Sequence, residues 1–172
     1  MNRSILIIFL FASSTISGCL GGGEEPSDDM MVLPILEDPC LIPSSPTTQS
    51  LTSIEVDGVE REFRLSAPSS EPGTRLPLVI AFHGGTDSQE DFAQQEQFDQ
   101  LGEQEKFIMA YAIAEQDRTA AEGEWFLNTA ATSEEDNNFA EAIVDELSES
   151  YCIDQDRLYA IGYSLGSMYT YE

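Results

Sequence analysis

The stretch LYAIGYSLG, residues 158–166, decides the fold that the rest of the chain has to fit. Its first half, Leu158 to Ile161, is a short apolar run that indicates a buried strand. Its second half, Gly162 to Gly166, is a Gly-x-Ser-x-Gly motif, which after a strand predicts a sharp, strained turn into a helix. The glycines let strand and helix approach closely, and the turn projects the hydroxyl group of Ser164 away from the sheet. Ser164 is therefore the candidate nucleophile.

The segments before this motif alternate between strand and helix patterns. Two runs of alternating apolar and polar residues flank Asp57 and Gly58, a pair typical of a tight β-hairpin. Nearly continuous apolar runs indicate strands that are covered on both faces, and residues with helical spacing separate these runs. The pattern predicts an α/β fold, a mostly parallel sheet with flanking helices preceded by an antiparallel pair. We expect strands at Leu76–Phe82, Phe107–Ala112 and Leu158–Ile161, and helices from a Ser88/Asp91 capping box to Lys106 and over residues 136–150.

A second turn with glycines, His83-Gly84-Gly85, directly follows the Leu76–Phe82 run. In enzymes with a serine at a strand-to-helix turn, such a loop supplies one backbone N–H that stabilises a negatively charged oxygen. The residue after the serine supplies the other N–H, at the positive end of a helix. The N–H groups of Gly85 and Leu165 are therefore the candidate oxyanion hole.

Few residues of this chain could activate Ser164. A serine hydroxyl is a weak nucleophile and needs a histidine held by a carboxylate. His83 is the only histidine, and we favour a role for it in organising its own turn over a role as the base. Asp154 and Asp156 precede the last strand and are expected to form a turn there. After Ser164 the only acidic residue is Glu172, so the catalytic set is incomplete.

The N-terminus has the layout of an export signal. An apolar run from Ile5 to Ala12 follows Arg3, and it is too short to span a membrane. Residues 16–19 look like a bacterial lipobox, in which Cys19 is lipidated and becomes the mature N-terminus; an ordinary secretory signal is the alternative. We expect a lipoprotein signal peptide at 1–18, the lipidated cysteine with a flexible acidic, Pro-, Ser- and Thr-rich tether at 19–50, and a folded domain at 51–172.

The composition excludes one class of partner. The chain has 32 Asp and Glu residues against 7 Lys and Arg residues, and its net charge of −25 repels nucleic acid and anionic lipid surfaces. We expect no nucleic-acid partner, no metal ion and no cofactor. Apart from Cys19, the cysteines are Cys40 and Cys152, an even pair in a chain bound for an oxidising space. They form either a disulfide or two buried thiols, and the sequence alone gives neither their separation nor their orientation.

Several separate segments together resemble one protein family. LPLVIAFHGG at Leu76–Gly85, Trp125 in its loop, and CIDQDRLYAIGYSLG at Cys152–Gly166 are similar to the poly(3-hydroxybutyrate) depolymerase and feruloyl esterase family of secreted α/β-hydrolases. The resemblance covers Val56 to Tyr169, the N-terminal half of such a domain, and implies the α/β-hydrolase fold. Trp125 is either a core residue, which we favour, or part of a substrate cleft.

The resemblance implies hydrolysis of a small-molecule or polymeric ester through an acyl-enzyme at Ser164, with Gly85 and Leu165 as oxyanion hole. It also favours a disulfide between Cys40 and Cys152. The catalytic acid and histidine of the family would follow the last residue, so we expect a C-terminally truncated enzyme that is inactive by itself. The alternatives are a non-catalytic surface lipoprotein that uses the domain for binding, and a peptidase or thioesterase on the same fold. The expected location is extracytoplasmic, anchored to a bacterial membrane or secreted.

Overall fold

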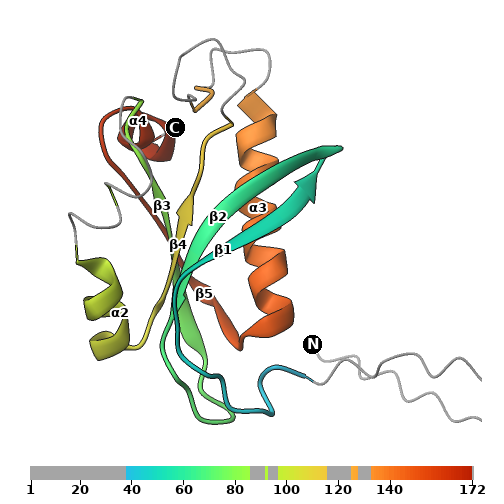
Figure 1. Ribbon diagram of the computed structural model, residues 1–172, viewed down its shortest axis with the longest axis vertical. Coiled ribbons are helices and arrows are strands. Elements are labelled where there is room, and N and C mark those ends of the chain that lie inside the picture. Colours follow the sequence, from blue (N-terminus) through green and yellow to red (C-terminus); the bar gives the residue numbers. More distant parts are fainter. Residues whose placement is uncertain (1–37, 86–91, 93–96, 116–124, 128–132, 172) are drawn as a thin grey trace, which may run out of the picture. The chain divides into compact units, whose positions relative to one another are not determined.

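The computed structural model describes residues 38–85, 92, 97–115, 125–127 and 133–171 (Figure 1). Four predicted features lie outside these residues: the signal peptide, lipidation at Cys19, the first part of the tether and the Ser88/Asp91 capping box. Within the described ranges, no helix combines the length and the apolar character needed to cross a bilayer.

The described elements follow the predicted alternation of strands and helices. The helix α3 (Ser133–Ser150) starts three residues earlier than expected, and the acidic side chains of its first turn stabilise the positive end of the helix. The strands are β1 (Thr47–Val56), β2 (Val59–Ala67), β3 (Leu76–Phe82), β4 (Ile108–Ala112) and β5 (Ile153–Gly162). The helices are α2 (Phe98–Glu105), α3 (Ser133–Ser150) and α4 (Leu165–Tyr171).

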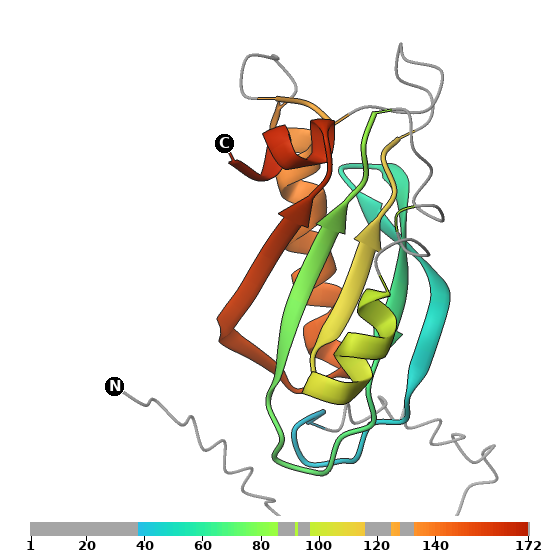
Figure 2. The same cartoon turned by 90° about the vertical axis from the view of Figure 1, so that its left-hand side faces the viewer.

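The five strands form one mixed sheet in the order β1-β2-β4-β3-β5 (Figure 2). β1 and β2 form the predicted hairpin, and both turn residues, Asp57 and Gly58, have positive φ, as a tight hairpin turn requires. β2 pairs with β4 in antiparallel orientation, whereas β3 is parallel to both β4 and β5. The carboxyl ends of β3, β4 and β5 therefore meet at one edge of the sheet.

Helices cover both faces of the sheet, with α2 on one face and α3 on the other (Figure 2). The face under α3 carries the larger core, where Phe139, Ile143 and Leu147 lie at helical spacing and are buried against the sheet. Burial of each such side chain stabilises the fold by roughly 2 kcal/mol. On the α2 face, Tyr111 is fully buried, and its hydroxyl donates to Asp99 at 2.8 Å. Burial, reinforced by Asp99, raises the pKa of Tyr111.

The last strand differs from its predicted burial. The apolar run at 158–161 predicts a covered strand, but Leu158 is 40% exposed and Tyr159 is 54% exposed. The cause is the place of β5 in the sheet, because it pairs with β3 on one side and is the outermost of the five described strands. An apolar edge strand of this kind is a surface that another strand can pair with.

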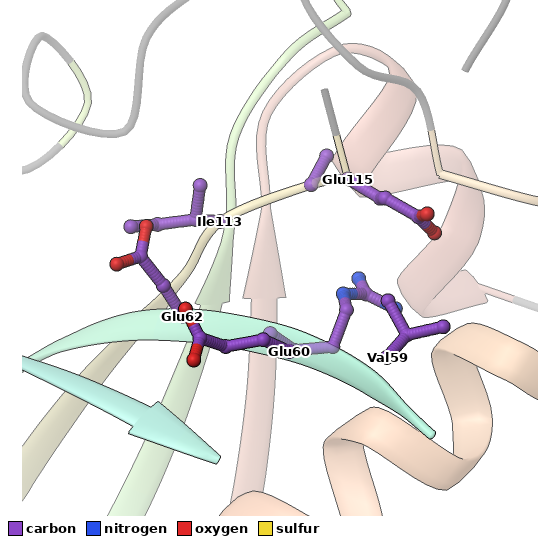
Figure 3. Close-up of a pocket in the computed structure, with 7 residues that line it drawn as sticks. Val59, Glu60, Glu62, Ile113 and Glu115 are labelled. Carbon is purple, nitrogen blue, oxygen red and sulfur yellow. The ribbon is translucent and has the colours of Figure 1, made fainter. Parts of the chain in front are cut away.

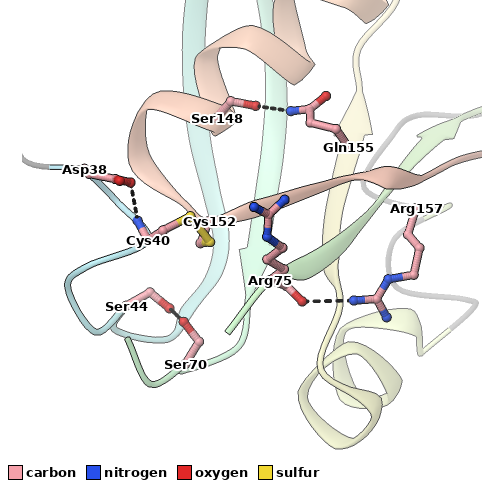
Figure 4. Close-up of a disulfide and its surroundings, with 9 residues drawn as sticks. All are labelled: Asp38, Cys40, Ser44, Ser70, Arg75, Ser148, Cys152, Gln155 and Arg157. Atoms are coloured by element: carbon pink, nitrogen blue, oxygen red, sulfur yellow. Dashed lines mark hydrogen bonds between the residues drawn. A yellow bond between two sulfur atoms is a disulfide. The ribbon is translucent and has the colours of Figure 1, made fainter. Parts of the chain in front are cut away.

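The sequence predicted that the folded domain starts at Leu51, but in the structure the folded part begins earlier. β1 starts at Thr47, and upstream of it Cys40 forms a disulfide with Cys152, with their Cα atoms 4.5 Å apart (Figure 4). The hydroxyl groups of Ser44 and Ser70 lie 2.8 Å apart and add a second link. The residues between Cys40 and Thr47 are thus held in place by cross-links. They show no apolar periodicity, so the sequence pattern did not predict them as part of the folded domain.

Candidate active site

Ser164 lies at a sharp turn between β5 and α4. β5 ends at Gly162 and α4 begins at Leu165, so only two residues connect them. The backbone of Ser164 is left-handed, with a φ of +50°, which strains a residue other than glycine. The N–H of Tyr163 donates to the carbonyl of Phe82 at 3.1 Å, and this bond ties the turn to the end of β3. The side chain of Ser164 is exposed.

Both glycines of the motif are required by close backbone contacts. A Cβ atom on Gly166 would overlap the carbonyl oxygens of Phe82 and His83 at the end of β3. A Cβ atom on Gly162 would overlap the backbone of Gly166. Because backbone atoms cannot rotate aside as a side chain can, these positions accept only glycine in this arrangement.

The predicted oxyanion loop leaves the sheet beside this turn. Phe82, the last residue of β3, pairs with Gly162, the last residue of β5. A Cβ atom placed on Gly85 would lie 3.2 Å from Cδ2 of Leu165, so these two residues are direct neighbours. As the first residue of α4, Leu165 has a backbone N–H without an intrahelical acceptor. The structure thus brings together Ser164, Gly85 and Leu165.

His83 is buried, with 2% of its surface exposed, and both of its ring nitrogens are engaged. Nδ1 lies 2.7 Å from the carbonyl oxygen of Gly84, and Nε2 lies 3.2 Å from the backbone nitrogen of Ala114. Because a carbonyl can only accept, Nδ1 carries the hydrogen, and Nε2 accepts from the N–H of Ala114. This neutral ring has no nitrogen left to take a proton from Ser164, and the contacts fit the predicted role in organising the turn.

Trp125 joins the loop at His83 to α4. Its indole N–H donates to the carbonyl of His83 at 2.9 Å. Its ring makes an edge contact with Phe82 at 5.0 Å and stacks on Tyr169 of α4 at 5.8 Å. Only 2% of Trp125 is exposed, so it is a core residue beneath the turn and does not line an open cleft.

A buried ion pair that the sequence pattern did not predict lies next to Trp125. Arg61 of β2 and Asp136 of α3 are 3.0 Å apart, with 3% and 0% of their side chains exposed. The second carboxylate oxygen of Asp136 accepts the N–H of Phe126 at 2.7 Å, and the guanidinium group of Arg61 lies 4.1 Å from the ring centroid of Phe139. The signal was present, because Arg61 occupies an inward position of a strand whose other inward residues are apolar. A charge at such a position predicts a buried partner.

Asp154 and Asp156 lie near the amino end of β5, away from Ser164. The guanidinium group of Arg157 donates to Asp154 at 2.6 Å, and the N–H of Asp156 donates to it at 3.1 Å. These bonds, Arg157 foremost, hold the pKa of Asp154 below its usual value. The predicted turn before the strand is therefore wrong: both residues lie inside β5, where its pairing with β3 is irregular between Ile153 and Leu158.

A cavity of about 390 Å³ lies where β2 begins and β4 ends (Figure 3). Its acidic lining comes from Glu60 and Glu62 of β2 and from Glu115, which follows β4. Ser164, Gly85 and Leu165 are not among its lining residues, so this cavity is separate from the candidate active site.

Comparison with known proteins adds one sequence relative and several structural neighbours, while no family model matches the chain. The relative, a Nocardia uniformis subsp. tsuyamanensis protein named "Putative esterase NocK", is 29% identical over 133 residues, which are 73% of this chain and 37% of that protein. This chain therefore spans little more than a third of the curated relative that it matches.

The structural neighbours include an S-formylglutathione hydrolase from Agrobacterium tumefaciens and a ferulic acid esterase. The first has a TM-score of 0.59 at 13% identity and covers 75% of this chain and 55% of its own. The second has a TM-score of 0.54 at 13% identity and covers 72% of this chain and 54% of its own. At such identities the likeness concerns the fold alone. The strand order, the glycine-flanked serine turn and these neighbours together confirm the predicted fold class: the chain has an α/β-hydrolase fold.

Proposed function

We propose that this chain belongs to a serine carboxylic-ester hydrolase of the polyhydroxybutyrate depolymerase and feruloyl esterase type, with Ser164 as nucleophile. The observation that carries the proposal is the turn itself: an exposed serine at positive φ, directly after a parallel strand, with Gly85 packed against the residue that follows the serine. The likeness to a protein named as an esterase supports the same reaction class. The substrate is a small-molecule or polymeric ester.

The reaction follows from the positions of these groups. Oγ of Ser164 attacks the ester carbonyl carbon, and the negative charge that develops on the carbonyl oxygen is stabilised by the N–H groups of Gly85 and Leu165. When the bond from that carbon to the alkoxy oxygen breaks, the alkoxy group leaves with the proton that Oγ gave up, and the acyl group stays on Ser164. Water then attacks the acyl-enzyme, which releases the acid and restores the serine.

The proton in this scheme needs a general base. Both ring nitrogens of His83 are engaged, and the sequence contains no other histidine. We therefore assign the base and its carboxylate partner to residues outside these 172, and we expect the 172-residue chain by itself to be inactive.

The site of action in this proposal is extracytoplasmic, with Cys19 lipidated and the domain tethered to a bacterial membrane or secreted. The bond between Cys40 and Cys152 supports this location, since such disulfides persist in oxidising compartments. The lipobox-like residues before Cys19 support the anchor.

Active-site labelling tests the proposal on the longest naturally encoded protein that contains this chain. A fluorophosphonate should label it at Ser164, and Ser164→Ala should abolish both labelling and hydrolysis of p-nitrophenyl acetate. Ser167→Ala, which removes an exposed serine from the same helix, is the matched control and should retain both. Methyl ferulate and poly(3-hydroxybutyrate) films then distinguish the substrate types.

Two outcomes would contradict the proposal. If the longer protein folds but stays unlabelled, the result would favour the alternative of a non-catalytic binding protein. Turnover by the isolated 172-residue chain that Ser164→Ala removes would refute the assignment of the base to residues outside it.

A further inference from the structure

The carbonyl group of His83 is held from two sides. The indole N–H of Trp125 donates to its oxygen at 2.9 Å. From the other side Gly166 approaches so closely that a Cβ atom there would lie 2.6 Å from the same oxygen. The peptide unit between His83 and Gly84 therefore has a fixed orientation, because a peptide bond is planar.

The next peptide unit, between Gly84 and Gly85, is held by the side chain of His83. Nδ1 of His83 donates to the carbonyl of Gly84 at 2.7 Å. In a trans peptide unit the N–H points opposite to the carbonyl group, so this bond also sets the direction of the N–H of Gly85. Two successive peptide units are thus fixed immediately before the proposed oxyanion donor. Trp125 fixes the first of them and His83 the second.

The backbone next to Trp125 is held by Asp136 of α3. The N–H of Phe126 donates to Asp136 at 2.7 Å, and the other oxygen of the same carboxylate pairs with Arg61 at 3.0 Å. A hydrogen bond to a charged acceptor in a buried site is stronger than one between neutral groups. A chain of contacts therefore runs from β2 and α3 through residues 125–126 to the oxyanion loop.

We infer that Trp125 is a positioning residue for the oxyanion hole: its indole N–H orients the His83 peptide group so that the N–H of Gly85 faces the ester carbonyl, and Asp136 holds Trp125 in place. The inference rests on the proposed ester hydrolysis at Ser164. It assigns the indole nitrogen a role distinct from that of the indole ring, which packs on Phe82 and Tyr169.

The substitution Trp125→Phe separates these two roles, because phenylalanine keeps an aromatic ring and lacks the N–H donor. The variant is made in the longest naturally encoded protein that contains this chain. There kcat for p-nitrophenyl acetate should fall about 10-fold or more, while KM changes less than about 2-fold. The reason is that a displaced oxyanion donor weakens transition-state binding rather than substrate binding. Tyr169→Phe is the matched control. It removes a hydroxyl that bonds to Asn137 at 3.0 Å and leaves the His83 carbonyl untouched, so kcat should stay within about 2-fold of the wild-type value.

Hydrogen exchange gives a readout that does not depend on activity. Trp125→Phe should speed exchange of the Gly84 amide, which is buried and belongs to the peptide unit that Trp125 holds, whereas Tyr169→Phe should not. If the wild-type protein proves inactive and unlabelled, the proposed function fails and the catalytic part of the inference fails with it, while faster exchange would still show that Trp125 orders the loop.

Three results would overturn the inference: a wild-type kcat in Trp125→Phe, a change confined to KM, or equal effects of the two variants. If Trp125→Phe does not fold, Asp136→Asn tests the same link, because it keeps an oxygen acceptor for Phe126 and removes the charge. It should lower kcat with little change in KM, and an unchanged kcat would equally overturn the inference.

Discussion

Strands β3 and β5 run side by side, and their two ends are held together in different ways. At the carboxyl ends backbone meets backbone, with Gly166 against the carbonyl groups of Phe82 and His83. At the amino ends the backbones also meet, since the N–H of Leu76 donates to the carbonyl of Cys152 at 2.8 Å, but here the disulfide from Cys152 to Cys40 adds a side-chain link to the segment before β1 (Figure 4). The candidate chemistry lies at the first of these ends only.

The contrast separates two physical requirements. Backbone contact fixes the position of reacting groups closely, but it leaves no space for an added side chain. A disulfide stabilises the fold mainly by restricting the unfolded chain, so its removal costs stability without crowding the native structure. We therefore expect substitutions of the glycines at the carboxyl ends to lower the free energy of unfolding strongly. Removal of the disulfide at the amino ends should lower it less.

The largest effect is expected from Gly166→Ala at the carboxyl end. The new methyl group would overlap backbone atoms of β3, so the free energy of unfolding should fall by more than about 4 kcal/mol. Gly58→Ala is the matched control. Gly58 has a φ of +82° with no atom within 4 Å of an added Cβ, so only backbone strain of about 1–2 kcal/mol is expected. Urea denaturation measures both losses, and equal losses would show that steric overlap is not the cause.

A smaller effect is expected from removal of the disulfide, as Cys40→Ala with Cys152→Ala. The bond joins residues 112 positions apart, and its loss should lower the free energy of unfolding by about 3 kcal/mol. A reductant should destabilise the wild-type protein by a similar amount and leave the double variant unchanged. Fluorophosphonate labelling of Ser164 under native conditions should persist, and its loss in a folded double variant would contradict the independence of the two ends.

The smallest effect concerns the carboxylate of Asp154, near the amino end of β5. The pKa of Asp154 is lowered by the hydrogen bond from Arg157 and then by the Asp156 N–H, with a weaker contribution from the charge of Arg75. A lowered native pKa stabilises the fold above the unfolded pKa, and this contribution is lost as the pH falls through the native value. Arg157→Ala should therefore raise the pKa of Asp154 in an NMR titration, and Arg75→Ala should raise it less. The reverse order would show that the hydrogen bond is not the main cause.

Much of the fold could be predicted from local pattern. The Asp57-Gly58 turn, the covered strands β3 and β4 and the apolar face of α3 all follow from residue type and spacing, because each depends on neighbours within a few positions. The start of the folded part before Thr47 could not be predicted in this way. It depends on Cys40 meeting a cysteine 112 residues away, and the residue pattern left open whether the two thiols pair, although the family resemblance favoured the bond.

The sequence by itself determined that a serine stands between a strand and a helix with glycine on both sides, since a chain of this pattern has one favourable local arrangement. The tertiary structure decided what surrounds it. Register pairs Phe82 with Gly162 and so places Gly85 beside Leu165, and long-range packing joins Trp125 to the carbonyl of His83. The physical reason is that a turn is specified by the conformational preferences of adjacent residues, whereas a hydrogen bond between distant segments forms only when the whole sheet and its helices are in place.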